Sequence, residues 1–224
     1  MFWSDLKQLV GAILLILGAV LPVVNPLGDA PIFLKMTPGC DEATQALLAR
    51  RIALYSFFYL LGSLLLGSFV LVIFGLSIAL VQVAGGAVVC ALAWHVLADI
   101  PKPADVTLDA AHANSIALGR AITPLTLPMT IDAGVISVAI TVGAFHAGSL
   151  EHTVIQLLAA IIGAAIISLC ILLTYRYAHR LSKRLGQAGT MFLVRLSAFI
   201  MLCIGVGISW NGIKSLLGEV GIHS

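Results

Sequence analysis

Six long apolar runs dominate this sequence, and they constrain its fold more than any other feature. The runs lie at about 6–36, 47–74, 76–98, 115–146, 153–175 and 191–217. A helix needs roughly 20 apolar residues to cross a hydrocarbon core of about 30 Å, so each run is long enough to span a bilayer. Only 10% of the 224 residues are charged, whereas soluble domains carry about 25%. The sequence therefore predicts an all-α integral membrane protein of six transmembrane helices, with the lipid bilayer as its surroundings.

The links between the runs are short, and none is polar and long enough to form a soluble domain. We therefore interpret residues 1–224 as a single membrane domain, divided by its longest link, about 101–114, into residues 1–100 and 115–224. The first run lacks the small-x-small cleavage site of a signal peptide, so we expect it to be retained as a helix. Thr37 and Pro38 predict the start of the second helix, as its N-cap and first helical residue.

Several classes of chemistry are not expected. The four cysteines show no CxxC pairing, and most lie in apolar runs where thiols pack as small apolar groups, so no metal site, disulfide or cofactor is expected. Hydrolase and metalloprotease patterns are absent. Leu27-Gly28-Asp29 matches part of an aspartyl intramembrane protease pattern, but its Tyr-Asp partner is missing. We expect neither an enzyme nor, at a net charge of +2, a nucleic-acid partner.

Positive charge is distributed unevenly between the links. If six helices alternate in direction, the links after the first, third and fifth share one side of the membrane. That side and its flanks would carry most lysines and arginines: Lys35, Arg50, Arg51, Lys102, Arg120, Arg176, Arg180, Lys183, Arg184 and Arg195. The other side would carry Lys7 and Lys214. Because cytoplasmic loops are enriched in Lys and Arg, we predict a multi-pass protein of the bacterial inner membrane with both termini on the periplasmic side.

The first and fourth runs contain helix-breaking residues in their middles. Residues 22–31 include three prolines, and residues 123–134 include two. Proline removes a backbone donor and clashes with the preceding turn, so helices 1 and 4 are predicted to be discontinuous. Unwound backbone at membrane depth is tolerated only where protein buries it or where it lines a cavity. The two breaks are therefore candidates for a solute site, with kinks of no function as the alternative.

The breaks also occupy corresponding places in the two halves of the chain. Pro26-Leu27 in the first run corresponds to Pro124-Leu125 in the fourth, and Gly62 in the second run corresponds to Gly163 in the fifth. Because each half would hold three helices, an odd number, the two repeats would be inverted relative to one another. Broken helices at matching positions of inverted repeats indicate the central site of a transporter.

Asp29 and Asp132 are the acidic residues that lie well inside apolar runs, and each follows a break. A carboxylate at the bilayer centre costs roughly 2.5–3.5 kcal/mol, so it normally faces a cavity or a partner. One or both could bind a substrate ammonium or exchange a proton that couples transport to the proton gradient. Alternatively, each only caps its own half-helix. Arg195 could pair with either aspartate or extend to the cytoplasmic surface.

The leading hypothesis is a secondary transporter of small polar solutes that works by alternating access around a midplane site. A membrane channel and a non-transporting regulatory membrane protein are the alternatives. The expected partners are a small-molecule substrate and H⁺ as coupling ion, and a homo-oligomer remains open. The predicted substrate-binding residues come from the two breaks: Asn25, Pro26, Leu27, Gly28, Asp29, Pro31, Thr123, Pro124, Thr126, Pro128, Thr130, Asp132 and Gly134.

The same segments resemble the MarC family of bacterial inner-membrane proteins. The resemblance rests on Asn25-Pro26-Leu27-Gly28 with Pro31 and Phe33, and on Pro124-Leu125 with Pro128 and Gly134. It extends over essentially the whole chain and implies a six-helix bundle that transports small neutral amino acids such as glycine or alanine. The family usually has Gly-Pro-Gly where this chain has Asp132-Ala133-Gly134, and Asp29 stands where an uncharged residue is expected.

Overall fold

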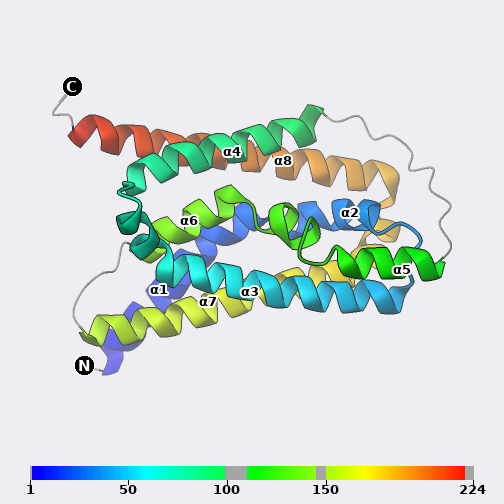
Figure 1. The fold of residues 1–224 in the computed structure, drawn as a ribbon, viewed down its shortest axis with the longest axis horizontal. Coiled ribbons are helices and arrows are strands. Elements are labelled where there is room, and N and C mark those ends of the chain that lie inside the picture. Colours follow the sequence, from blue (N-terminus) through cyan, green and yellow to red (C-terminus); the bar gives the residue numbers. More distant parts are fainter. Residues whose placement is uncertain (1, 99–109, 145–149, 220–224) are drawn as a thin grey trace.

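The computed structural model describes residues 2–98, 110–144 and 150–219, and these residues are almost entirely helical (Figure 1). Most of the predicted 101–114 link, with Lys102, lies outside the described residues. The described part contains no strand, which confirms the all-α class. The elements are α1 (Phe2–Val24), α2 (Pro26–Met36), α3 (Glu42–Ile73), α4 (Ile78–Ala98), α5 (Ala110–Gly119), the π-helical segment η1 (Leu125–Thr130), α6 (Ala133–Ala144), α7 (Leu150–Arg176) and α8 (Ala178–Glu219).

Five described stretches are long and apolar enough to cross a membrane: Trp3–Met36, Glu42–Gly67, Ile78–Ala98, Val154–Arg176 and Met191–Gly218. The fourth predicted span, 115–146, is built differently, from parts of the chain that are individually too short: α5, η1 and α6. Its residues 145–146 lie outside the described part. Together these pieces run from one end of the bundle to the other, antiparallel to α7 (Figure 1). The structure therefore has five candidate spans and one interrupted segment at the positions of the six helices that the sequence predicts.

The connection between α2 and α3 differs from the sequence-based prediction. Thr37 ends α2 rather than starting α3, because its hydroxyl donates to the Phe33 carbonyl at 2.9 Å. Asp41 caps α3 instead, since its carboxylate accepts a hydrogen bond from the Thr44 amide at 2.8 Å. Hydrogen bonds from the Thr44 side chain and backbone lower the pKa of the Asp41 carboxyl from its ordinary value. The prediction that Thr37 is the N-cap is therefore wrong.

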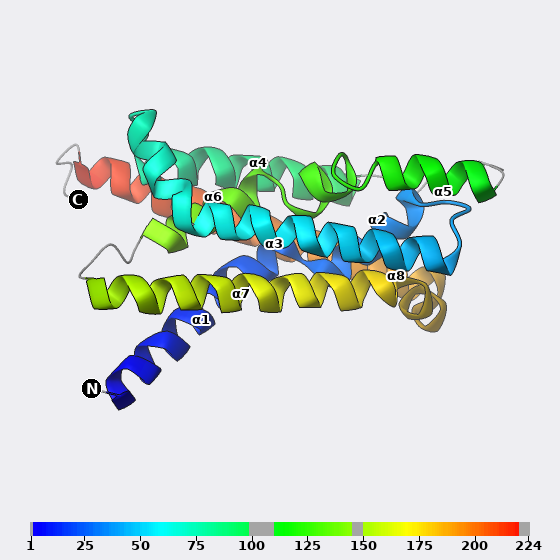
Figure 2. The ribbon, with the colours of Figure 1, turned by 60° about the horizontal axis from the view of Figure 1, so that its bottom comes forward.

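The two ends of the bundle have different charge. The start of α1 and the end of α8 lie at the same end, which we call the terminus end (Figures 1 and 2). The opposite end holds the last turn of α2, the first turns of α3, and the junction between α7 and α8 (Figure 1). Its positive side chains include Lys35, Arg50, Arg51, Arg176 and Arg180, and we call it the cationic end. The predicted segregation of charge therefore appears as two distinct ends of the bundle.

Helices from one half of the chain pack mainly on helices from the other half. The helix α4 lies along α8, while both α1 and α3 pack on α6 and α7 (Figure 1). The helix α2 packs on α7, α8 and η1, and α4 also packs on α6. This set of contacts is largely preserved when α1–α2 is exchanged with η1–α6, α3 with α7, and α4 with α8. For example, the contact of α2 with α8 corresponds to that of α6 with α4.

The core lies where α3 and α7 meet the two interrupted segments. Leu48, Ile52 and Leu60 of α3 and Ile167 and Ile171 of α7 are almost completely buried there. Many large apolar side chains on the outer faces are exposed, among them Phe58, Phe69, Phe192 and Phe199. Apolar exposure on this scale is rare in soluble monomers and suits contact with lipid.

Candidate functional site

The first break occupies a single residue, Asn25, which has left-handed backbone angles of φ 45° and ψ 56°. The helix α1 reaches this residue intact, because the Asn25 amide still donates to the Leu21 carbonyl at 3.0 Å. Its side-chain oxygen accepts from the Gly28 amide at 3.3 Å, and its carbonyl accepts from the Asp29 amide at 3.2 Å. Pro26 then begins α2 at a position where no N–H is needed. Asn25 therefore ends one helix and caps the next.

The first turn of α2 carries Gly28 and Asp29. A Cβ added to Gly28 would lie 2.7 Å from the Ser197 Cβ, so α2 and α8 approach closely here. The half-buried Asp29 carboxyl forms no hydrogen bond with any described residue. It interacts electrostatically with Asp132 and with the phenol of Tyr175. Asp29 is thus a carboxyl group inside an apolar span whose oxygens are free to bind something else.

The second break extends over several residues, from the end of α5 to the start of α6. The Thr123–Pro124 and Leu127–Pro128 peptide bonds are cis, and Leu127 has extended backbone angles inside η1. The buried Thr126 hydroxyl donates to the Ala121 carbonyl at 2.7 Å, and the Thr130 hydroxyl donates to the Leu125 carbonyl at 2.8 Å. These buried threonines therefore satisfy carbonyl groups of an irregular backbone.

Asp132 has a defined structural role at the end of this break. Its side chain is 6% exposed and accepts a hydrogen bond from the Val135 amide at 2.8 Å, which caps α6. A Cβ added to Gly134 would collide with the Val89 side chain, so α6 and α4 are in close contact at this cap. Asp132 therefore caps α6, whereas the Asp29 carboxylate caps no described amide.

Tyr175, near the end of α7, joins the two breaks, and the sequence analysis did not identify it. The ring stacks on Phe33 of α2, with centroids 4.8 Å apart, and its hydroxyl lies 2.9 Å from the Thr130 hydroxyl. Because Thr130 donates to the Leu125 carbonyl, Tyr175 donates to Thr130. A tyrosine in an apolar run signals that its hydroxyl needs a buried partner. Only the tertiary structure identifies that partner.

The structure brings together part of the predicted set. The helix α2 packs on η1, so the two breaks lie side by side (Figure 1). Asp29, Thr130 and Asp132 gather there, while Pro26, Gly28, Pro31 and Thr126 support them as packing or backbone residues. The side chains of Leu27, Thr123 and Pro128 are exposed, and Pro124 is half-buried. Arg195 is exposed and forms no ion pair with either aspartate, so of its two alternatives the pairing is not found.

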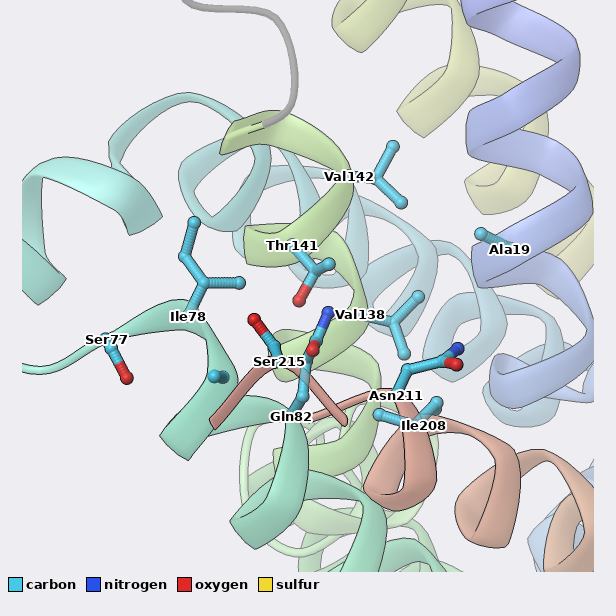
Figure 3. A pocket seen from close by; sticks show the side chains of 11 residues that line it. Ala19, Ser77, Ile78, Gln82, Val138, Thr141, Val142, Ile208, Asn211 and Ser215 are labelled. Atoms are coloured by element: carbon cyan, nitrogen blue, oxygen red, sulfur yellow. The ribbon is translucent and has the colours of Figure 1, made fainter. Parts of the chain in front are cut away.

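A cavity of about 600 Å³ lies at the terminus end (Figure 3). It is lined by one residue of α1 and by residues from α4, α6 and α8, among them Gln82, Thr141, Asn211 and Ser215. Figure 3 shows the polar ends of Gln82, Thr141 and Ser215 close to one another. None of the described lining residues is charged. At the cationic end, the cavity beside Thr37 and Arg120 measures only about 40 Å³. Of these two cavities, the larger lies at the terminus end.

The described residues include no group of three or more His, Cys, Asp or Glu side chains that could hold a metal ion. The chemistry available at the breaks is therefore that of two carboxyl groups, a phenol, threonine hydroxyls and backbone amides. Such groups bind ammonium, hydroxyl or amide groups of a solute and can exchange protons.

Comparisons with known proteins assign this chain to a family. The family described as MarC family integral membrane protein matches residues 10–217. A UPF0056 membrane protein of Bacillus subtilis is 28% identical over 195 residues, which cover 87% of this chain and 90% of the relative. The UPF0056 inner membrane protein MarC of Salmonella typhimurium is 25% identical over 219 residues, covering 95% and 97%. No solved structure matches the chain significantly. The chain is therefore an integral, multi-pass membrane protein that belongs to the MarC family.

Proposed function

We propose that this protein is a secondary carrier of small, neutral, polar solutes, with its binding site between the two helix breaks. The observation that carries the proposal is the meeting of breaks from opposite halves of the chain around Asp29, an intramembrane carboxyl group without a hydrogen-bond partner among the described residues. Ionisable groups inside membrane spans are costly and mark ion or substrate pathways. Asp29 would bind a substrate ammonium or carry the coupling proton, while Asp132 maintains the start of α6.

The contacts between the halves support an inverted-repeat layout of six membrane-crossing segments, two of them discontinuous. Contacts made by α1–α2 in one half have counterparts made by η1–α6 in the other. Two such halves can rock against each other and expose the central site to one side at a time. In this proposal, the cavity of about 600 Å³ at the terminus end is the solute entrance in one state of that cycle.

The proposal also covers the membrane in which the protein lies, its orientation there and the class of its substrate. The cationic end would face the cytoplasm of a bacterial inner membrane and both termini the periplasm, because positive residues are retained on the cytoplasmic side. The uncharged polar lining around Gln82 and Asn211 favours entry of a solute without net charge. A zwitterion such as glycine or alanine meets this condition and supplies an ammonium for Asp29. We propose no catalytic activity.

The test is exchange of labelled glycine and alanine in proteoliposomes that contain the purified chain, with and without an imposed pH gradient. A carrier gives saturable uptake that unlabelled solute inside the vesicles accelerates, and a proton-coupled carrier responds to the gradient. Single-channel currents in planar bilayers would instead identify a channel. The absence of flux for both solutes, with folded protein in the vesicles, would reject the amino acid assignment and favour a regulatory membrane protein.

A further inference from the structure

A second cavity, away from the breaks, lies at the cationic end between the first turn of α3 and the junction of α7 with α8. Its volume is about 230 Å³. The lining consists mainly of polar and charged side chains, including Glu42 and Gln45 of α3 and Arg176, His179 and Arg180 of the junction. The transport hypothesis uses none of these residues. The cavity is therefore a separate candidate site.

Two guanidinium groups determine the charge of this cavity. The junction keeps helical hydrogen bonds, from the Tyr177 amide to Leu173 and from the Leu181 amide to Tyr177, at 3.1 and 2.9 Å. Arg176 ends α7, Arg180 lies in the first turn of α8, and both line this cavity, so their like charges repel. Neither arginine forms an ion pair with an acidic residue in the described part of the chain. The lining contains one acidic residue, Glu42, against the two arginines, so an added anion would be favourable.

Tyr177 holds one of these arginines in place. The Arg180 guanidinium carbon lies 5.5 Å from the centre of the Tyr177 ring, a cation–π arrangement. The ring occupies one face of the guanidinium and leaves its N–H groups free to donate. A guanidinium presents these donors in a planar fork that matches two oxygens of a phosphate group.

The position along the helix indicates where the anion comes from. The apolar span of α7 runs from Val154 to Arg176, so the arginines lie where hydrocarbon gives way to lipid headgroups. Leu169 and Leu173, two turns and one turn before Tyr177, are 52% and 47% exposed. Their spacing of four residues places them on the face of α7 that ends at Tyr177, which lines the cavity. An apolar stripe therefore leads directly into the cationic cavity.

We propose that this cavity binds the phosphate of an anionic phospholipid, with an acyl chain lying along Leu169 and Leu173. Arg176 and Arg180 bind the phosphate oxygens, and Gln45 and His179 supply further polar contacts. The apolar stripe distinguishes a lipid from a soluble phosphate, because only a lipid covers both the stripe and the cavity. The leaflet on the cytoplasmic side is rich in anionic lipid, which agrees with the orientation expected of the cationic end.

The test compares lipid retention by the purified full chain, measured by native mass spectrometry and thermal unfolding in a neutral detergent. Phosphatidylglycerol, phosphatidylcholine and soluble glycerol phosphate are added at equal concentration. The double variant R176Q/R180Q removes the site, and R50Q/R51Q is the matched control, because it removes two exposed cations of the same end outside the cavity. We expect roughly fivefold weaker retention of phosphatidylglycerol for each cavity arginine removed, with little change in the control.

Each outcome decides the proposal. Selective loss of phosphatidylglycerol in R176Q/R180Q supports it, and equal loss in both double variants overturns it in favour of diffuse attraction to positive charge. An equal effect of glycerol phosphate identifies a soluble anion and also overturns it. If R176Q/R180Q does not fold, Glu42→Gln provides the second test, because removing the acidic residue should strengthen retention. Unchanged or weaker retention in that variant contradicts the proposal.

Discussion

The two breaks interrupt their membrane spans by different means. At the first, one left-handed residue, Asn25, ends α1 and caps α2 with hydrogen bonds to the next few residues. At the second, the irregular backbone extends from the end of α5 to Ile131 and depends on contacts with other helices. Tyr175 of α7 binds Thr130, and Val89 of α4 packs against Gly134. The first break is therefore a local structure, and the second is supported by tertiary contacts.

The same difference separates the two aspartates. Asp132 is committed to the α6 cap, so its carboxylate has a structural partner in the chain. Asp29 lies in the first turn of α2, where Asn25 already provides the cap, and its carboxyl remains without a hydrogen bond in the described part of the chain. At the first break, Asp29 is therefore available for a ligand. At the second break, Asp132 instead stabilises the backbone of the break itself.

The largest expected effect is on the rate of transport, and it distinguishes the roles of Asp29 and Asp132. Asp29→Asn should reduce solute exchange in proteoliposomes roughly thirtyfold or more, because losing one partner of a buried charge pair costs about 2–5 kcal/mol. Asp132→Asn should lose less than about tenfold, since Asn is nearly as good an N-cap as Asp. Flux assays at matched amounts of folded protein measure both. Equal losses in the two variants would contradict the assignment of different roles.

The next effect concerns the packing that supports the second break. Gly134→Ala should lower the free energy of unfolding by about 1–3 kcal/mol, because its Cβ would collide with Val89 of α4. Thermal unfolding in detergent measures this change. Gly62→Ala is the control, because no atom lies within 4 Å of the added Cβ there. Adding Val89→Ala to Gly134→Ala should recover part of the loss, and no recovery would place the strain elsewhere.

A smaller effect tests whether the first break is local. Asn25→Ala should cost about 1–2 kcal/mol of stability, since alanine loses the cap to Gly28 and disfavours a φ of 45°. Asn25→Gly keeps the backbone freedom and should cost only a few tenths of a kcal/mol. Unfolding temperatures of the two variants provide the comparison. If the glycine variant were the less stable one, tertiary contacts of the Asn25 side chain would be decisive.

The smallest effect is expected at the hydroxyl that connects the breaks. Tyr175→Phe keeps the stacking on Phe33 but removes the donor to Thr130, which should cost about 1 kcal/mol. Thr130→Val and the double variant complete a double-mutant cycle, measured by the same unfolding assay. A coupling energy near zero would show that the 2.9 Å contact contributes little and that the two breaks are held together by packing alone.

The sequence singled out the segments of the two breaks because proline acts on its own helix, but it did not give the residue at which the first one occurs. Pro22 and Pro31 lie inside α1 and α2, and the backbone departs from helical angles at Asn25 between them. The link between the fifth and sixth runs was less predictable. Residues 178–185 continue as helix, and the chain turns at Gly186, whose φ is 65°. The polar residues of this link do not distinguish a loop from a short polar helix, because the two have similar compositions.

The candidate site was only partly predictable for a related reason. The pattern singled out Asp29 and Asp132 as a pair but could not distinguish the cap from the free acid, because capping depends on where the amides of α6 lie. Tyr175 was missed because its partner Thr130 is 45 residues away in the chain. Gln82 and Asn211 line one cavity although they come from different halves.

By itself, the sequence determined that this protein lies in a membrane, that its spans are helices, and which two of them carry helix-breaking residues in their middles. These properties follow from the transfer of apolar side chains out of water and from the missing N–H of proline, which act within a span. The tertiary structure alone decided which acid lacks a hydrogen-bond partner among the described residues and which hydroxyl joins the breaks. Those properties depend on contacts between distant segments, and only the packed helices bring such segments together.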